Sequence, residues 1–247
     1  METIQVQFLG SGDAFGSGGR LQTCICIKAA NSTFLLDCGA SSLIAMRRFG
    51  VAPNDIDMIL LTHLHGDHFG GIPFFVLDAQ LVSKRSRPLI IVGPTGTKRR
   101  VVEAMEVFFP GSSQVQHAFA WEIREFAPEQ TQTLGDVTVT SYLVRHPAGD
   151  PSLALRIECN GKIISYSGDT QWTETLLKAS RGADLFIAEA YFFEKQVKFH
   201  LDLHTLLAHL DELQPKRLIV THMSEDMLSR LEELPCDYAE DGKRIEV

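Results

Sequence analysis

Hydrophobic positions along the chain follow two periods, one typical of strands and one typical of helices. Residues 4–9 alternate apolar and polar side chains and predict a strand, whereas residues 71–81 are apolar at helical spacing. Further strands are predicted at 24–28, 32–37, 56–61, 89–92, 137–144, 153–159, 162–166, 185–188 and 217–221. Further helices are predicted at 41–49, 98–109, 173–179, 203–213 and 225–234.

Hairpins are mixed with strand–helix alternation in two similar halves of the chain. In the first half, the strands 24–28 and 32–37 flank the turn signal Ala30-Asn31. This mixture predicts an α/β (α+β) fold in which two sheets pack together and carry helices on their outer faces. With 247 residues and 45% hydrophobic content, the chain can bury a large core, and we expect one domain over residues 1–247.

Composition narrows the classes of function. A formal net charge of −8 disfavours a protein that coats nucleic acid, so DNA is not an expected partner. The sequence has no apolar stretch of roughly 20 residues and no basic N-terminal region followed by an apolar run, so we expect a cytoplasmic protein without membrane contact. Its five cysteines lack CxxC spacing and indicate neither a disulfide framework nor a Cys₄ zinc site.

Candidate metal ligands follow four of the predicted strands. The densest group comes directly after the apolar residues 56–62 and consists of His63, His65, Asp67 and His68. The other strand ends are followed by His146, Asp169 and His222. Imidazole and carboxylate groups suit Zn²⁺, Mn²⁺ or Fe, and loops held by a rigid sheet can give ligands a fixed geometry. His117 and His209 lie in polar or helical surroundings and are predicted to be surface residues.

These motifs and their order resemble the metallo-β-lactamase superfamily over essentially the whole chain. The HxHxDH run, the later His146, the Ser-Gly-Asp-Thr sequence around Asp169 and the Thr-His pair at 221–222 follow in that family's order. The resemblance implies an αββα four-layer sandwich that holds two divalent ions, with Zn²⁺ the first expectation and Mn²⁺ or Fe the alternatives. It implies that His63, His65 and His146 hold one ion, that Asp67, His68 and His222 hold the second, and that Asp169 bridges both.

Within the superfamily, smaller segments are similar to ribonuclease Z. They are residues 8–12, 92–96, 152–157 and 166–170. This resemblance implies a dinuclear phosphodiesterase, in which a hydroxide shared by two metals attacks a small or RNA phosphodiester, and it makes a homodimer an expected assembly. It also implies that Asp67 belongs to the catalytic set together with a paired Glu and His that help to protonate the leaving oxygen. Glu189 and His204 correspond to this pair, with His200 a competing candidate.

The interval between His146 and Asp169 departs from the tRNA-processing members. Only 22 residues separate the two, where those members commonly carry a long arm that grips tRNA. The chain therefore resembles arm-less relatives, and a small phosphodiester is favoured over tRNA. The basic runs 84–87 and 98–100 are interpreted as solvated faces, because most charge runs are.

Two other functions use the same residues differently. A thioester or lactone hydrolase of the glyoxalase II-like kind would employ the same metals with a pocket suited to acyl groups. A non-catalytic sensor or scaffold would have lost some of the ligands, and none is lost from this sequence. The phosphodiesterase is therefore the leading hypothesis.

Overall fold

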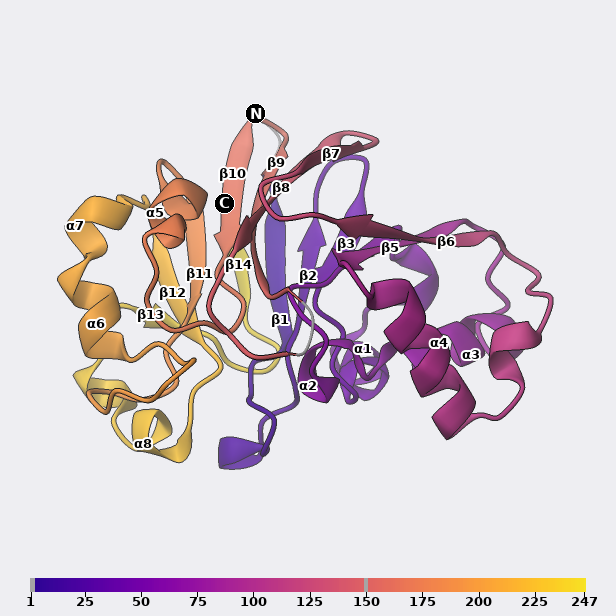
Figure 1. Ribbon diagram of the computed structural model, residues 1–247, viewed down its shortest axis with the longest axis horizontal. Coiled ribbons are helices and arrows are strands. Elements are labelled where there is room, and N and C mark those ends of the chain that lie inside the picture. The colour runs from indigo at the N-terminus through magenta and orange to yellow at the C-terminus, as the bar shows by residue number, and fades with distance from the viewer. Residues whose placement is uncertain (1–2, 149–150) are drawn as a thin grey trace.

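The computed structural model describes residues 3–148 and 151–247, in which two seven-stranded mixed sheets face each other (Figure 1). The first sheet has the order β14-β1-β2-β3-β4-β5-β6, with bounds Arg244–Glu246, Gln5–Gly10, Cys24–Lys28, Thr33–Leu36, Met58–Leu60, Leu89–Pro94 and Trp121–Phe126. The second has the order β13-β12-β11-β10-β9-β8-β7, with bounds Asp237–Tyr238, Leu218–Thr221, Leu185–Glu189, Lys162–Tyr166, Leu153–Cys159, Val137–Leu143 and Thr131–Leu134.

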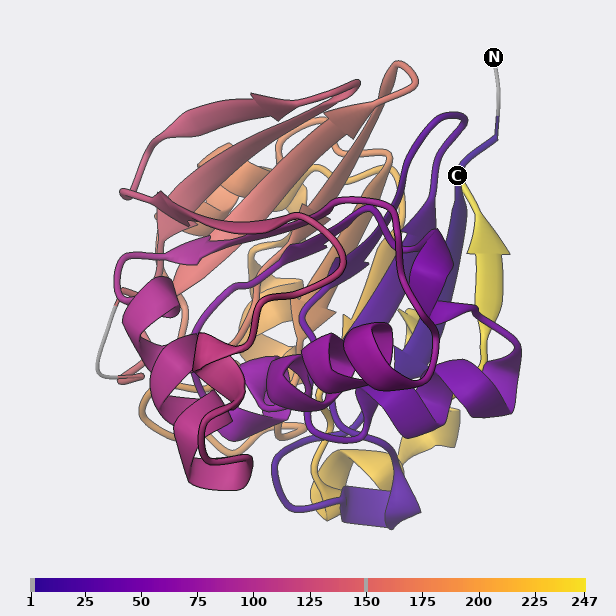
Figure 2. The same ribbon diagram turned by 90° about the vertical axis from the view of Figure 1, so that its right-hand side faces the viewer.

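Helices cover the outer face of each sheet and complete four layers, as the turned view in Figure 2 also shows. Those beside the first sheet are α1 (Ser42–Phe49), α2 (Gly66–Phe69), α3 (Ile72–Leu81) and α4 (Thr97–Phe108). Those beside the second are α5 (Thr175–Ser180), α6 (Leu203–Ala208), α7 (Leu210–Leu213) and α8 (Glu225–Leu228). Short 3-10 turns lie at Ser17–Gly19, Pro53–Asp55, Ser112–Gln114 and Leu231–Glu233.

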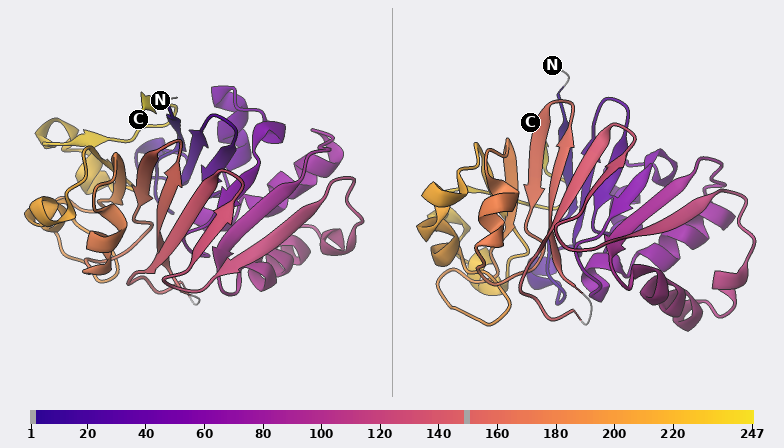
Figure 3. Two further views of the ribbon diagram at one scale, coloured as in Figure 1. Left: turned by 90° about the horizontal axis from the view of Figure 1, so that it is seen from above. Right: turned by 45° about the horizontal axis from the view of Figure 1, so that its top comes forward.

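The strand period explains how the layers hold together. In β1, Val6 and Phe8 point into the apolar core between the two sheets. Figure 3 shows the two sheets from above and tilted forward. Leu9 packs instead into the core between the first sheet and its helices. A third apolar cluster joins the second sheet to α5 and α6. Burial on both faces of each sheet yields the predicted αββα sandwich.

Strand direction brings the ends of distant segments to one edge of the molecule. The strands β3, β4 and β5 are parallel, and so are β10, β11 and β12. The carboxyl ends of parallel strands lie at the same edge of their sheet, where ligand-binding loops of α/β proteins gather. The segments that follow β4, β8, β10 and β12 therefore meet between the two sheets, close to α2 (Figure 1).

Some element boundaries differ from the predictions. The strands β6 and β7 were not predicted; β6 carries three charged residues and β7 two threonines, so neither shows an apolar run. The predicted helix 203–213 is interrupted at His209, and the predicted helix 225–234 contains only α8 and a 3-10 turn. Within the residues that the structure describes, no helix is long and apolar enough to cross a membrane.

Candidate metal centre

Three histidines from two sheets form the first cluster of the centre. His63 and His65 follow β4, and His146 follows β8. His65 Nδ1 lies 3.0 Å from His146 Nε2, and the ring of His63 lies within 4.9 Å of both other rings, measured between centroids. Three imidazoles with one ring nitrogen each turned toward a common point are a set that Zn²⁺ and related ions prefer.

A second cluster lies beside the first and contains two carboxylates and two imidazoles. His68 Nε2 lies 3.3 Å from Asp67 Oδ2, and His222 Nε2 lies 3.3 Å from the same oxygen. Asp169 completes the cluster, with Oδ1 at 3.3 Å from His68 Nε2 and Oδ2 at 3.4 Å from His222 Nε2. The structure therefore brings together all seven side chains that the sequence predicted as ligands.

Asp169 faces both clusters. Its Oδ2 lies 3.8 Å from His63 Nε2 and 3.9 Å from His146 Nε2, in addition to the second-cluster contacts. Burial by itself would raise the pKa of this carboxyl, but the surrounding His222 and His68 hold the pKa well below its ordinary value. The carboxylate is therefore charged, and it can interact with cations on either side.

The pKa values of His63 in the first cluster and His68 in the second shift in opposite directions, because the two rings have different neighbours. Burial and the neighbouring His68 hold the pKa of His63 well below its ordinary value. Burial would also lower the pKa of His68, but the carboxylates of Asp169, Asp67 and Asp37 raise it well above the ordinary value. The opposite directions thus follow from the carboxylates, which lie next to His68 but are fewer around His63.

The residues present fit a pair of divalent cations. The Nε2 atom of His63 is buried and makes no hydrogen bond with any residue that the structure describes. Buried polar atoms are nearly always paired, so an orphan nitrogen beside a charged carboxylate fits a metal ligand. All donors in the two clusters are imidazole nitrogens or carboxylate oxygens, which suit Zn²⁺, Mn²⁺ and Fe.

The outer nitrogens of these histidines are held by other groups. Thr62 Oγ1 lies 3.1 Å from His63 Nδ1, and Asp37 Oδ2 lies 2.7 Å from His68 Nδ1. The carbonyl oxygen of Phe199 lies 3.0 Å from His146 Nδ1. Such contacts fix the ring and leave Nε2 to face the centre. Asp37 was missed by the sequence analysis, which counted it as the last residue of the predicted strand 32–37; it directly follows β3.

Glu189 pairs with His200, which corrects the predicted pairing with His204. Glu189 is fully buried at the end of β11, and its Oε1 receives a hydrogen bond from His200 Nδ1. His204 lies in the first turn of α6, where its side chain is exposed to solvent. The segment before α6 has to turn back at residues 199–200, and this turn brings His200 rather than His204 to Glu189.

The Glu189–His200 pair borders the second cluster. Glu189 Oε1 lies 3.6 Å from His222 Nδ1, and the ring centroids of His200 and His222 are 6.2 Å apart with nearly parallel planes. Burial and the nearby Asp169 raise the pKa of Glu189. Burial would lower the pKa of His200, but its hydrogen bond with Glu189 raises it. His200 is therefore suited to carry a proton.

A cleft of about 360 Å³ opens over both clusters. Beyond the clusters and His200, its lining includes Asp13, Phe15 and Tyr191. Phe15 is 84% exposed, while Asp13 is buried and accepts hydrogen bonds from the backbone N–H groups of Phe15 and Ser17. The glycine-rich loop after β1 therefore forms one wall of the cleft, a role that its sequence signalled only weakly.

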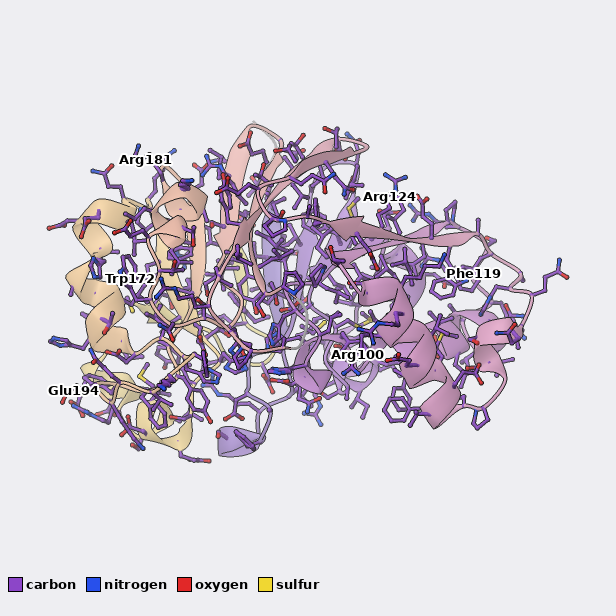
Figure 4. All side chains as sticks on the ribbon, viewed as in Figure 1. Arg100, Phe119, Arg124, Trp172, Arg181 and Glu194 are labelled. Atoms are coloured by element: carbon purple, nitrogen blue, oxygen red, sulfur yellow. The ribbon has the colours of Figure 1, made fainter. Side chains whose placement is uncertain are left out.

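Residues predicted to lie on the surface are outside the centre. His209 stacks on Trp172 with ring centroids 3.7 Å apart (Trp172 is labelled in Figure 4), and His117 contacts Phe119. In the basic run 84–87, the interpretation as a solvated face is wrong for Arg85, which is buried and donates hydrogen bonds to the carbonyl groups of Pro53 and Ile56. Arg100, labelled in Figure 4, forms an ion pair with Glu103 on α4.

Comparison with known proteins identifies the family. A family model described as "Anti-Pycsar protein Apyc1" matches residues 4–243. The chain belongs to this family. Among curated proteins, it is 24% identical to a ribonuclease Z of Lachnoclostridium phytofermentans over 98% of this chain and 93% of that protein.

Solved structures share the fold. The metallo-β-lactamase fold protein YhfI of Bacillus subtilis has a TM-score of 0.79 at 20% identity. The match covers 100% of this chain and 100% of that one. A diphosphatase from the PhnP family has a TM-score of 0.79 at 19% identity, covering 99% of this chain and 98% of that one. The predicted metallo-β-lactamase fold and the predicted metal-dependent hydrolase resembling ribonuclease Z are therefore confirmed.

Proposed function

We propose that the protein is a dinuclear metal-dependent phosphodiesterase that acts on a small phosphodiester. The observation that carries this proposal is the position of Asp169 between the two ligand clusters, with Oδ1 3.3 Å from His68 Nε2 and Oδ2 3.8 Å from His63 Nε2. A carboxylate shared by two cations keeps them close enough to act on one phosphate group.

Seven side chains hold the ions in this proposal. His63, His65 and His146 would hold one ion, Asp67, His68 and His222 would hold the other, and Asp169 would be shared by both; Zn²⁺ is the first expectation, with Mn²⁺ and Fe as alternatives. Two such ions supply a hydroxide nucleophile near neutral pH and neutralise charge on the phosphoryl oxygens. Asp67 contributes to catalysis as a ligand, since its carboxylate lies 3.3 Å from both His68 Nε2 and His222 Nε2.

The Glu189–His200 pair acts as the proton donor. Glu189 holds His200 through Nδ1 and raises its pKa, so that Nε2 can donate a proton to the oxygen that leaves the phosphorus atom. An alkoxide leaving group benefits from a proton donor more than a thiolate does. The pair therefore supports a phosphodiesterase over a thioester hydrolase.

The cleft supports a small substrate over folded RNA. Its volume of about 360 Å³ is near the lower end of the roughly 300–1,000 Å³ of small-molecule sites. The described residues between His146 and Asp169 form the hairpin of β9 and β10, which supplies no arm. An RNA substrate is the second candidate, because the curated relatives include enzymes named ribonuclease Z.

A substrate panel tests the proposal. The metal-loaded protein is assayed with a 2′,3′-cyclic nucleotide, a cyclic ribose phosphate, a bis-aryl phosphate, a precursor tRNA and an acyl-glutathione thioester. We expect turnover of the small phosphodiesters. A marked preference for the thioester would overturn the proposal, and efficient cleavage of precursor tRNA alone would move the substrate to RNA.

We also propose that the protein is a homodimer, as its resemblance to ribonuclease Z implies. A candidate surface is the exposed apolar face of α3 and α4, where Phe74 is 36%, Phe108 50% and Val107 76% exposed. The rings of Phe74 and Phe108 lie 5.5 Å apart, so the face is continuous. Light scattering on the purified protein measures the mass, and a monomer at micromolar concentration would contradict this assembly.

A further inference from the structure

The segment between β11 and α6 lies against the candidate metal centre and carries His200. It has little regular secondary structure, and it closes on itself through a hydrogen bond from Tyr191 N–H to the carbonyl oxygen of Leu201, 2.8 Å long. The residue that precedes His200 is Phe199, with a φ of 72°. Bulky residues rarely occupy this left-handed region unless surrounding contacts hold them there.

Both polar groups of Phe199 are held by residues near the centre. Its N–H donates to Gln171 Oε1 at 3.2 Å, and its carbonyl oxygen accepts from His146 Nδ1 at 3.0 Å. Phe199 is 40% exposed, so burial of its side chain does not account for the unusual backbone conformation. The backbone groups of Phe199, rather than its ring, are therefore what the surroundings hold in place.

This turn sets the orientation of two functional side chains. When His146 Nδ1 donates to Phe199, its Nε2 is left free to face His65, 3.0 Å away, and Asp169. The following residue, His200, is directed by the same turn toward Glu189. A candidate metal ligand and the candidate proton donor thus depend on one backbone conformation.

Gln171 is itself fixed relative to the centre. Its N–H donates to the carbonyl oxygen of Arg145 at 3.2 Å, and the neighbouring Thr170 N–H donates to Glu189 Oε2 at 2.7 Å. Arg145 directly precedes His146, and Thr170 directly follows Asp169. The Gln171 side chain therefore transmits the position of the two ligand-bearing loops to the segment that carries His200.

We propose that Gln171 and Phe199 are positioning residues that couple the geometry of the metal ligand His146 to that of the proton donor His200. This inference rests on the proposed function and assigns a role to two residues outside the ligand set. The Phe199 turn holds both the outer nitrogen of His146 and the side chain of His200. Loss of the Gln171 contact with this turn is therefore expected to weaken metal binding and to slow turnover together.

The test compares substitutions of these residues with a matched control on the same segment. Gln171→Leu removes the acceptor, Gln171→Glu keeps one, and Phe199→Gly keeps the backbone groups in a residue that favours positive φ. Gln196→Leu is the control, because Gln196 is exposed and bonds only Thr205 among the contacts that the structure describes for its side chain. Zinc affinity is measured by competition with a chromophoric chelator, and kcat and KM are measured on a small phosphodiester.

Gln171→Leu is expected to lower zinc affinity roughly 10–100-fold, as is typical for outer-contact substitutions, and to lower kcat about as much with little change in KM. Gln171→Glu, Phe199→Gly and the Gln196→Leu control are expected to stay within a few-fold of the parent protein. Thermal unfolding of the metal-free variants verifies that each one folds, and Gln171→Ala replaces Gln171→Leu if the latter does not.

Three outcomes would overturn the coupling. They are unchanged zinc affinity and kcat in Gln171→Leu, an equal loss in Gln196→Leu, and a full loss in Phe199→Gly, which would assign the role to the ring. The zinc measurement needs no substrate, so unchanged zinc affinity in Gln171→Leu would overturn the inference even if no phosphodiester is hydrolysed. If the protein hydrolyses phosphodiesters and Gln171→Leu changes neither zinc affinity nor kcat, the inference is overturned while the proposed function stands.

Discussion

His68 shows how individual contacts shape the centre. Its Nδ1 lies 2.7 Å from Asp37, while Nε2 faces Asp67 and Asp169. Asp37 is fully buried, has a positive φ of 58°, and also accepts a hydrogen bond from Thr62 N–H. A buried carboxylate that is itself held by hydrogen bonds fixes the histidine ring and makes the histidine a more basic metal ligand.

Replacing Asp37 is expected to weaken metal binding without touching a ligand. Asp37→Asn should lower zinc affinity roughly 10–100-fold, because His68 loses its charged partner. The measurement is competition with a chelator at neutral pH. Asp136→Asn is the control, because Asp136 bonds Ser32 away from the centre. Equal affinities in Asp37→Asn and the parent protein would contradict the role of Asp37.

His200 and His204 can be separated by substitution. His200→Ala is expected to retain metal and to lose roughly 10²–10⁴-fold in kcat, the usual contribution of a general acid. His204→Ala should keep full activity, because its side chain is exposed on α6 and does not reach Glu189. The check is kcat together with metal content by elemental analysis. Equal losses in the two variants would contradict the assignment.

The candidate ligands were predictable as a set, because the dense run His63–His68 gave meaning to the later His146, Asp169 and His222, but the candidate proton donor was not. Each ligand follows a strand whose apolar run is visible in the sequence, and strands that share a direction bring their ends together. The choice between His200 and His204 depends on a left-handed turn at Phe199. Phe199 is not a residue type that signals such a turn, because glycine or asparagine usually occupies this conformation.

Among the elements, edge strands and short helices were the hardest to predict. The edge strand β6 is only partly buried and mixes Trp121 and Ile123 with charged residues, so its sequence has no apolar run. His209 ends α6 while it stacks on Trp172 from the segment before α5. Because His209 and Trp172 are far apart in the sequence, the helical periodicity of residues 203–213 could not predict that the helix ends at His209.

Asp184 connects neighbouring elements of the second sheet and makes their stability depend on pH. It accepts a hydrogen bond from Ile163 N–H at the start of β10 and pairs with Lys216 before β12. Burial would raise the pKa of Asp184, but these hydrogen bonds lower it below its ordinary value of 3.8. Its stabilisation is therefore complete above 3.8 and is lost as the pH falls through the folded-state pKa.

Asp184→Asn is expected to lower the free energy of unfolding by about 1 kcal/mol near neutral pH. The difference from the parent protein should shrink when the pH falls well below 3.8. Urea unfolding at several pH values measures both effects. The exposed Asp211→Asn on α7 serves as the control and should show neither. A difference that stays constant with pH would show that charge on Asp184 is not responsible.

At the scale of the whole molecule, the candidate ligands come from both sheets. The run His63–His68 follows a strand of the first sheet, whereas His146, Asp169 and His222 follow strands of the second. Ions held by this set would link the two halves of the sandwich across the core between them. Metal binding should therefore contribute to global stability as well as to catalysis.

Removal of metal is expected to lower the thermal stability of the protein. One ion at a hundred times its dissociation constant stabilises a fold by about 2.7 kcal/mol, so a chelator should lower Tm by several degrees, and added Zn²⁺ should restore it. Differential scanning calorimetry measures the change. His63→Ala should reduce the shift, and an unchanged Tm on complete removal of metal would contradict a link between the sheets.

The candidate ligands are spread widely along the chain, and this affects when a newly synthesised chain can bind metal. The candidate ligands begin at His63 and end at His222, after β12, one of the last strands of the second sheet. A growing polypeptide therefore exposes several imidazoles long before it has a complete pair of sites. We expect metallation to follow release from the ribosome, and products truncated before β12 to bind zinc only weakly and without activity.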